Sequence, residues 1–268
     1  MALPGPRERG TAVVTGASSG IGAAIARELA GRGLGVTLVA RREDRLLDLA
    51  DELGSVHGVR AEAFATDLGE RSGREELAIE IERLGLEVDA LVNNAGFGYA
   101  GDFTEAERER QVAMVALNCE AVVDLCARCL PGMVARGSGA IINVASTGAF
   151  QPMPKSATYG ATKAFVLSFS EAIHSELGGT GVTVTAVCPG PVKTEFMDAS
   201  QIGGAEEALP DIFWLSAEDV AADAVKAAEA GKRAIVNGRL NHAGTLLGRH
   251  APRALSLPLT KRLWERTH

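Results

Sequence analysis

The segment TAVVTGASSGIG, residues 11–22, decides the fold of this chain. An apolar, β-branched run passes directly into a turn with glycines at positions 16, 20 and 22, and helical periodicity follows. A glycine-rich turn that opens into a helix lets backbone N–H groups approach a phosphate, because no Cβ atom stands in the way. The spacing is G-x-x-x-G-x-G rather than G-x-G-x-x-G, so a tight strand-to-helix turn without a ligand is the alternative.

Short β-branched runs recur along the chain and alternate with segments of helical periodicity. Near-continuous apolar strands that alternate with helices are typical of a parallel sheet covered on both faces. We therefore predict a single α/β domain over residues 1–238, with a doubly wound, Rossmann-type sheet of seven parallel strands. The predicted strands are 11–16, 35–40, 60–66, 89–96, 139–146, 181–190 and 233–238.

Composition and charge narrow the class of protein. The chain has 268 residues, of which 46% are hydrophobic and 23% charged, which is ordinary for a soluble globular protein. No apolar run reaches the roughly 18 to 20 residues that cross a bilayer, and the N-terminus lacks the apolar core of a secretory signal. We expect a cytoplasmic protein. The net charge of −7 argues against nucleic-acid binding, since phosphate contacts need a basic surface.

The four cysteines are too few for a disulfide scaffold in a chain of this size. Cys126 and Cys129 form a C-x-x-C pair, but no second half-site accompanies it and the surrounding sequence has helical periodicity. Packed thiols are therefore favoured over a metal or redox site. The histidines of the C-terminal region are too scattered to suggest metal ligands, so no metal site is expected.

The end of the second predicted strand bears on nucleotide choice. In dinucleotide sites, an acid about 20 residues past the glycines holds the ribose 2′-hydroxyl, whereas an arginine there accommodates a 2′-phosphate. Arg41 lies 19 residues after Gly22, Arg42 follows it, and Ala40 precedes it without a carboxylate. We predict NADP(H) rather than NAD(H). The alternatives are an exposed helix start, or a shifted register in which Glu43 accepts the ribose.

Tyr159 and Lys163 stand four residues apart in YGATK, so in a helix both side chains lie on one face. A free tyrosine has a pKa of about 10, and a cation within about 4 to 6 Å lowers that value. The pair predicts a group that transfers protons near neutral pH. Because Y-x-x-x-K is short, chance occurrence on an exposed helix is the alternative.

Five landmarks now stand in order: TGASSGIG at 15–22, NNAG at 93–96, Asn118, Ser146, and Tyr159 with Lys163. Together they resemble the short-chain dehydrogenase/reductase family, and the resemblance extends over about residues 11–194. The family pattern also includes Asp67 and Leu68 after the third strand and P-G-x-V-x-T at 189–194.

The resemblance implies a role for each matching position. Asn118, Ser146, Tyr159 and Lys163 would form the catalytic set. Arg41 and Arg42 would meet the 2′-phosphate, and Asp67 and Leu68 the adenine. The remaining cofactor-binding positions would be Gly16, Ser18, Ser19, Gly20, Ile21, Gly22, Asn94, Ala95, Gly96, Pro189, Gly190, Val192 and Thr194, together with Tyr159 and Lys163.

Hydride transfer to a carbonyl creates an alkoxide, so a proton donor must lie within hydrogen-bond reach of that oxygen. Tyr159 would be the donor in reduction and the base in oxidation, with its pKa lowered by Lys163. Ser146, at the end of the fifth strand, would orient the substrate oxygen. Asn118 would anchor a water for Lys163, a role implied by the family; an amide that caps local helix structure is the alternative.

Apolar residues flank the proposed site, so we expect a small apolar carbonyl or alcohol substrate. A lid over about residues 194–216 is suggested by the glycine pair Gly203-Gly204. These apolar residues are Phe97, Tyr99, Phe150, Pro152, Met153, Pro154, Phe196, Met197, Ile202, Leu209, Ile212, Phe213 and Trp214.

Residues 239–268 form a basic, apolar C-terminal extension, which Pro252 and Pro258 are expected to break into short pieces. From Gly231 onward there are eight lysines and arginines against one acid, Glu265. One hypothesis is contact with an anionic membrane surface or an acyl-type ligand. Packing against the acidic body or a second subunit is favoured.

Two further expectations concern assembly and function. The family is usually dimeric or tetrameric through helices that here span about 105–131 and 158–177, so a homodimer or homotetramer is expected. The alternative to an enzyme is a catalytically silent cofactor-binding regulatory protein of the same fold. The complete catalytic set speaks against it.

Overall fold

The computed structural model describes residues 3–196, 210–250 and 257. Seven parallel strands form one sheet in the order β3-β2-β1-β4-β5-β6-β7, which confirms the predicted doubly wound fold. The strand bounds are β1 Gly10–Thr15, β2 Val36–Ala40, β3 Ala61–Ala65, β4 Glu87–Asn93, β5 Gly139–Val144, β6 Val182–Cys188 and β7 Ala234–Val236.

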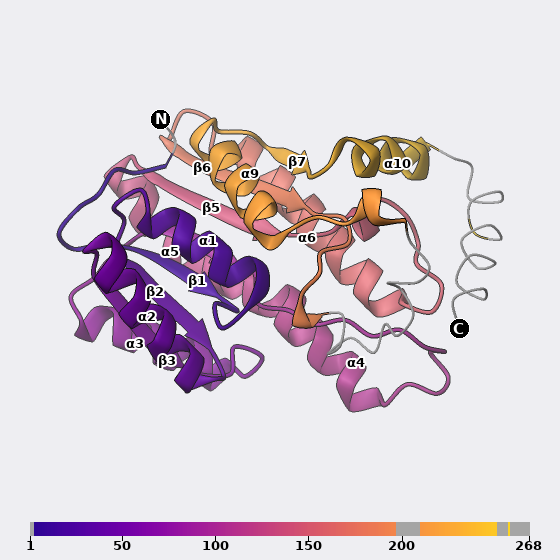
Figure 1. Ribbon diagram of the computed structural model, residues 1–268, viewed down its shortest axis with the longest axis horizontal. Helices are drawn as coiled ribbons and strands as arrows, with labels where there is room; N and C mark the ends of the chain where they lie inside the picture. The colour runs from indigo at the N-terminus through magenta and orange to yellow at the C-terminus, as the bar shows by residue number, and fades with distance from the viewer. Residues whose placement is uncertain (1–2, 197–209, 251–256, 258–268) are drawn as a thin grey trace.

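Helices cover both faces of the sheet (Figure 1). One core cluster joins one face of the sheet to α1, α2 and α9, and a second joins the opposite face to α3, α5 and α6. The bounds of these helices are α1 Gly20–Ala30, α2 Glu43–His57, α3 Arg71–Arg83, α5 Ala121–Arg136, α6 Ala157–Glu176 and α9 Ala217–Glu229.

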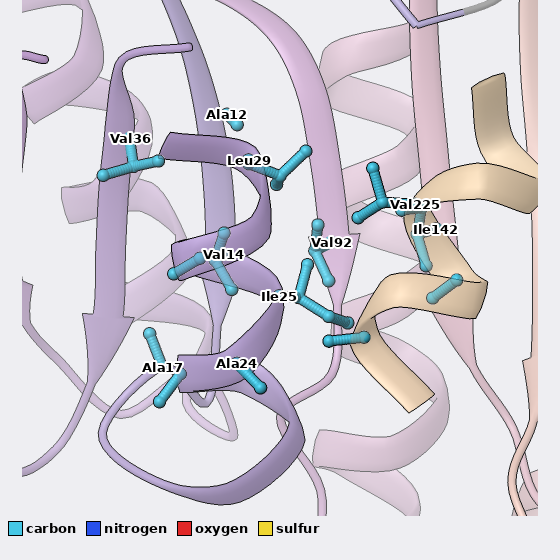
Figure 2. Packing of buried hydrophobic residues seen from close by; sticks show 14 of the residues in the cluster. Ala12, Val14, Ala17, Ala24, Ile25, Leu29, Val36, Val92, Ile142 and Val225 are labelled. Carbon is cyan, nitrogen blue, oxygen red and sulfur yellow. The ribbon is translucent and has the colours of Figure 1, made fainter. Parts of the chain in front are cut away.

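The first core cluster fixes the position of α1 behind the glycine-rich turn. Ile25 and Leu29 of α1 are fully buried, and in Figure 2 they point toward the strands that carry Val14 and Val92. Burying a side chain of this size contributes about 1.5 to 3 kcal/mol. Val225 of α9 lies over Ile142 of β5 in the same cluster. The N-terminus of α1 is therefore held rigidly at the end of β1.

The strand order reverses between β1 and β4, since β1 pairs with β2 on one side and with β4 on the other. In open α/β sheets, ligands bind in the crevice at the carboxyl ends of the strands beside such a switch point. The turn after β1 and the NNAG segment after β4 both lie there. The fold thus brings together two motifs that are far apart in the sequence.

The predicted helix over 105–131 differs in detail. It is a run of three elements: α4 Arg108–Val115, a single π-helical turn η1 Ala116–Glu120, and α5. A π-helical turn inserts an extra residue and changes the direction of the side chains that follow, and such turns are frequent at functional sites. Asn118 lies in the middle of η1.

The C-terminal region begins with α10, Arg239–His250, a continuous helix that ends before Pro252. It packs against β7 and against η2, the 3-10 turn Thr147–Phe150 that follows Ser146 (Figure 1). Most of the extension beyond His250, including Pro252 and Pro258, lies outside the described residues. Within the described ranges, none of the helices combines the length and hydrophobicity that a bilayer-crossing segment needs.

Candidate active site

A cleft of about 560 Å³ lies at the carboxyl ends of the central strands. Every residue predicted to bind a cofactor or to act in catalysis lines it, except Gly22 and Asn118. A second, more open groove of about 910 Å³ adjoins the cleft. The two cavities share Ser18, Ser19, Gly20, Thr194 and Glu195.

The glycine-rich turn is closely packed against the NNAG segment. Gly16 has a φ of +65°, a conformation that favours glycine. A Cβ atom on Gly22 would lie 2.3 Å from the Gly16 carbonyl oxygen and 2.5 Å from Nδ2 of Asn94. That Nδ2 donates to the backbone oxygens of Thr15 and Gly16, at 3.0 and 3.3 Å. The two motifs are therefore packed closely together, and the glycines leave their backbone open to a pyrophosphate.

Arg42 lies closer to this turn than Arg41. Its guanidinium donates to Oγ of Ser18 at 2.9 Å and to Oγ of Ser19 at 2.9 Å. Arg41 is largely exposed, with a side-chain nitrogen 3.9 Å from a carboxylate oxygen of Asp67. Together, Ser18, Ser19, Arg41 and Arg42 form a rim with two cations and two hydroxyls. This donor set fits a phosphate group.

Ser146 and Tyr159 meet at the other end of the cleft. Ser146 is the N-cap of η2, where its Oγ accepts a 3.0 Å hydrogen bond from the backbone N–H of Gly148. Its hydroxyl also shares a hydrogen bond with the Tyr159 hydroxyl. Because β5 positions Ser146 and α6 positions Tyr159, the sheet and helix packing set this contact.

Lys163 follows Tyr159 by one turn of α6 and is 6% exposed. Its Nζ donates a 2.7 Å hydrogen bond to the backbone oxygen of Val144 and lies 5.8 Å from the centre of the Tyr159 ring. The two side chains therefore share a face of α6, as predicted. A Cβ on Gly96 would lie 2.8 Å from Oδ1 of Asn118, so the NNAG segment needs a glycine here to pack against that amide.

The expected lowering of the Tyr159 pKa by Lys163 is wrong. Burial raises the pKa of the Tyr159 phenol to about 12, and the hydrogen bond with Ser146 opposes this rise without cancelling it. Burial also lowers the pKa of the Lys163 ammonium to about 8. Removal of both groups from water disfavours their charged forms, so burial is the main cause of both shifts.

Asn118 does not line the cleft; its amide holds the loop behind it. Its Oδ1 accepts from the backbone N–H of Phe97 at 3.2 Å, and its Nδ2 donates to the Phe97 carbonyl at 3.0 Å. Nδ2 also donates to Oγ1 of Thr162 at 3.1 Å, and that hydroxyl donates to the carbonyl of Tyr159. These bonds join η1 to the loop after β4 and to α6, so the Asn118 amide bonds to groups distant in sequence rather than capping its own helix.

The segment after β6 closes the cleft over the glycine turn. A Cβ on Gly20, which has a φ of +54°, would lie 3.0 Å from Cγ2 of Thr194. Val192 forms an isolated parallel bridge with Leu215, and the backbone N–H of Leu215 donates to Pro191 at 2.9 Å. The segment just before the predicted lid is thus adjacent to the last part of that lid. Residues 197–209, including Gly203-Gly204, lie outside the described residues.

The end of the cleft near Tyr159 is apolar. Phe97, Leu117, Met153 and Phe196 line it, and the Phe196 ring centre lies 5.7 Å from that of Tyr159. Other predicted pocket residues lie elsewhere: Phe150 packs against the core, and Trp214 lines the adjoining groove. Met197, Ile202 and Leu209 fall outside the described residues.

Three charged residues near the site, Arg45, Arg74 and Glu195, belong to none of the sequence motifs. Glu195 accepts hydrogen bonds from Arg42 at 2.8 Å and Arg45 at 2.6 Å. Arg74, which is 2% exposed, donates to the carbonyl oxygens of Leu68 and Gly69 and to the carboxylates of Glu120 and Asp124. An arginine seven residues after Asp67 gives no sequence signal of burial, since the carboxylates that pair with it lie about 50 residues away.

The cysteines are packed thiols, as expected. Burial raises the pKa of Cys126, Cys129 and Cys188 to about 12, which makes these thiols poor nucleophiles. Across residues 3–196 and 210–250, no three histidine, cysteine or acidic side chains gather as a metal site would require.

Comparison with known proteins gives the family. The family model described as short chain dehydrogenase matches residues 10–202. An uncharacterized oxidoreductase of Staphylococcus epidermidis is 36% identical over 193 residues, which cover 72% of this chain and 82% of the relative. A putative ketoacyl reductase of Streptomyces coelicolor is 39% identical over 211 residues, 78% of each chain.

A solved structure agrees in both fold and sequence. A short-chain dehydrogenase from Sphingobium yanoikuyae in complex with NADPH has a TM-score of 0.78 and 32% identity, covering 91% of this chain and 97% of that one. The residues 10–202 matched by the family model include strands β1 to β6, the glycine-rich turn and α6. The chain therefore belongs to the short-chain dehydrogenase family of oxidoreductases.

Proposed function

We propose that this protein is an NADP(H)-dependent oxidoreductase that transfers a hydride between the nicotinamide and a small apolar carbonyl or secondary alcohol. The observation that carries the proposal is the contact between Ser146 and Tyr159, with Lys163 buried beside them, in the same cleft as the glycine-rich turn. A proton-transferring group and a phosphate-binding surface at opposite ends of one cleft suit a dinucleotide-dependent reaction.

The choice of NADP(H) over NAD(H) is supported by the rim around Ser18. Two guanidinium groups, Arg41 and Arg42, lie at the end of β2, where Ala40 offers no carboxylate to a ribose hydroxyl. Bidentate guanidinium groups suit phosphate oxygens. The similar Sphingobium yanoikuyae protein is known as an NADPH complex. Asp67 and Leu68 would then face the adenine, and residues 189–194 the nicotinamide.

In the proposed mechanism, a bound nicotinamide supplies or accepts the hydride. The Tyr159 hydroxyl gives its proton to the developing alkoxide in reduction and takes it back in oxidation. Ser146, already hydrogen-bonded to that hydroxyl, orients the carbonyl oxygen and donates to it. Lys163, fixed on Val144, supplies positive charge beneath the site and replaces the proton lost from the phenol.

The substrate class is supported by the walls beside Tyr159. Phe97, Leu117, Met153 and Phe196 surround the reacting hydroxyl, and the two arginines of the cleft lie at its other end. An apolar pocket with two oriented hydroxyls favours an uncharged ketone or alcohol over an acidic metabolite. The Streptomyces coelicolor relative is named as a putative ketoacyl reductase, a carbonyl chemistry of the same class.

The proposed assembly is a homodimer or homotetramer through α4, α5 and α6. These helices expose apolar side chains, including Val112, Val115, Val123 and Phe165, that pairing of subunits would cover. Phe165 and Phe169 stack on α6 with ring centres 5.9 Å apart. Sedimentation analysis of the full chain tests the assembly separately from the activity.

The test of the function is NADPH oxidation with a panel of aliphatic and aryl ketones, alongside NADH. Wild-type protein should consume NADPH with at least one ketone. Tyr159→Phe and Lys163→Ala should each lower the rate by several powers of ten, and Tyr159→Phe should keep its affinity for NADPH. Near-normal turnover in either variant, or NADPH binding without turnover on any carbonyl, would contradict the proposal and favour a silent cofactor-binding protein.

A further inference from the structure

Glu195 connects two parts of the cleft that are distant in sequence. It follows Thr194 at the start of the predicted lid, and its carboxylate accepts 2.8 and 2.6 Å hydrogen bonds from Arg42 and Arg45 at the start of α2. The same residue lines both the cleft and the adjoining groove. The ion pairs therefore form a bridge between the segment after β6 and the phosphate-binding rim.

Arg42 makes this bridge at a position that matters for cofactor binding. One guanidinium nitrogen donates to Ser18 and Ser19, and another donates to Glu195. An incoming phosphate at the Ser18 rim would need those same donors. In the cofactor-free protein, the cation best placed for a 2′-phosphate is thus already paired with a carboxylate of the protein itself.

We propose that Glu195 competes with the 2′-phosphate of NADP(H) for Arg42, so that binding of the phosphorylated cofactor breaks the bridge between Glu195 and Arg42. This inference rests on the proposed function, because it requires a 2′-phosphate at the rim. NAD(H) carries no such group and leaves the bridge intact. Glu195 is therefore a specificity-determining residue that limits affinity for NADP(H).

The energetics allow such an exchange. Glu195, Arg42 and Arg45 are all exposed, and exposed ion pairs are weak. A phosphate monoester carries close to two negative charges at neutral pH and offers three acceptor oxygens, so it outcompetes a single carboxylate. The hydrogen bonds from Arg45 and Arg42 lower the pKa of Glu195 to about 2, which keeps the competing carboxylate charged wherever the protein is folded and active.

The experiment measures dissociation constants for NADPH and NADH by cofactor fluorescence, without substrate, on the full chain. Glu195→Gln should tighten NADPH binding about three- to tenfold, the effect expected from losing weak exposed ion pairs, and leave NADH binding unchanged. The matched control is Asp211→Asn, which removes one negative charge from the adjoining groove, where Asp211 faces Lys193 at 3.9 Å. It should change neither constant.

A double-mutant cycle locates the effect on Arg42. In an Arg42→Gln background, Glu195→Gln should give at most a small further change in NADPH affinity. Unchanged NADPH binding by the single variant Glu195→Gln would overturn the proposal. Weaker NADPH binding by that variant would overturn it as well, because Glu195 would then orient Arg42 for the phosphate. Equal tightening by Asp211→Asn would overturn it too. Failure of the proposed function would give a different result from failure of the Glu195 proposal. The wild-type protein would then bind neither cofactor, or would bind NADH more tightly than NADPH.

Discussion

The ammonium of Lys163 donates to the backbone oxygen of Val144 and lies 5.8 Å from the ring centre of Tyr159. The backbone of β5 thus fixes the distance between the two groups of the YxxxK motif. Without a cofactor, burial holds the phenol protonated and weakens the lysine's hold on its own proton. The pair is therefore not poised as a phenolate and an ammonium.

Replacing Lys163 by methionine is expected to stabilise the cofactor-free protein by about 1 to 3 kcal/mol at pH 7. The pKa of Lys163 falls from 10.5 when unfolded to about 8 when folded, so the unfolded chain binds more protons between these values. Burial of the charged Lys163 ammonium therefore lowers the free energy of unfolding by its full amount below pH 8. This destabilisation disappears as the pH rises toward 10.5. Loss of the bond to Val144 offsets part of the gain.

Urea unfolding of both proteins at pH 7, 8, 9 and 10 checks this prediction. The stability advantage of Lys163→Met should shrink steadily above pH 8. Tyr159 does not interfere in this range, because its raised pKa lowers stability only as the pH passes from about 10 to about 12. A variant that is less stable than wild type at every pH would show that the lysine supports the fold.

Ser146→Ala should lower kcat/KM for ketone reduction about 100- to 1,000-fold, the effect of losing one donor to a developing oxyanion. The same change removes the hydrogen bond that opposes the effect of burial, so the pKa of Tyr159 should rise further. Phenolate absorbance, titrated in wild type and variant, measures this second effect. Exposed Ser72→Ala on α3 is the control and should alter neither quantity.

Gly22→Ala should abolish cofactor binding and destabilise the protein by several kcal/mol, because its Cβ would clash with the Gly16 carbonyl and Asn94. Gly54→Ala in α2 is the matched control. A Cβ there would meet only Val59 at 3.8 Å, and alanine favours a helix over glycine by roughly 0.5 to 1 kcal/mol. Thermal unfolding and NADPH fluorescence measure both outcomes; normal cofactor binding by Gly22→Ala would contradict the assignment.

Arg74→Met should cost about 1 to 3 kcal/mol of stability and weaken cofactor binding. Arg74 is buried and ties the Leu68-Gly69 backbone to Glu120 in η1 and to Asp124 in α5, so methionine fills its space but leaves carbonyl oxygens unpaired. The control on the same helix is Arg71→Met, whose exposed pair with Glu75 is worth less than about 0.5 kcal/mol. Equal losses from the two variants would rule out the buried network as the cause.

The sheet could be predicted from the sequence because most of its strands are apolar, β-branched runs that alternate with helical periodicity. The predicted strands match the observed ones to within three residues at each end, for example 89–96 against Glu87–Asn93. The positions of Ser146, Tyr159 and Lys163 follow from the ends of β5 and the periodicity of α6. The sequence pattern within each segment predicts these features without any knowledge of contacts between distant segments.

Other features depend on contacts that the sequence does not reveal. The π-helical turn at Ala116–Glu120 has ordinary helix-forming residues, and the amide contacts of Asn118 with Phe97 and Thr162 lie on other elements. The direction of the Tyr159 pKa shift depends on how deeply the fold buries its hydroxyl. Glu195 and Arg42 are 153 residues apart, so their ion pair emerges only when the segment after β6 crosses the glycine turn.

The bridge between Val192 and Leu215 brings together the two ends of the chain segment 193–214. Such a segment can be swapped as a module, since its two anchor points stay fixed on the scaffold whatever lies between them. Substrate range and hydride chemistry can accordingly diverge separately. A relative that inherits Ser146, Tyr159 and Lys163 unchanged can acquire a new substrate by replacing this one insert.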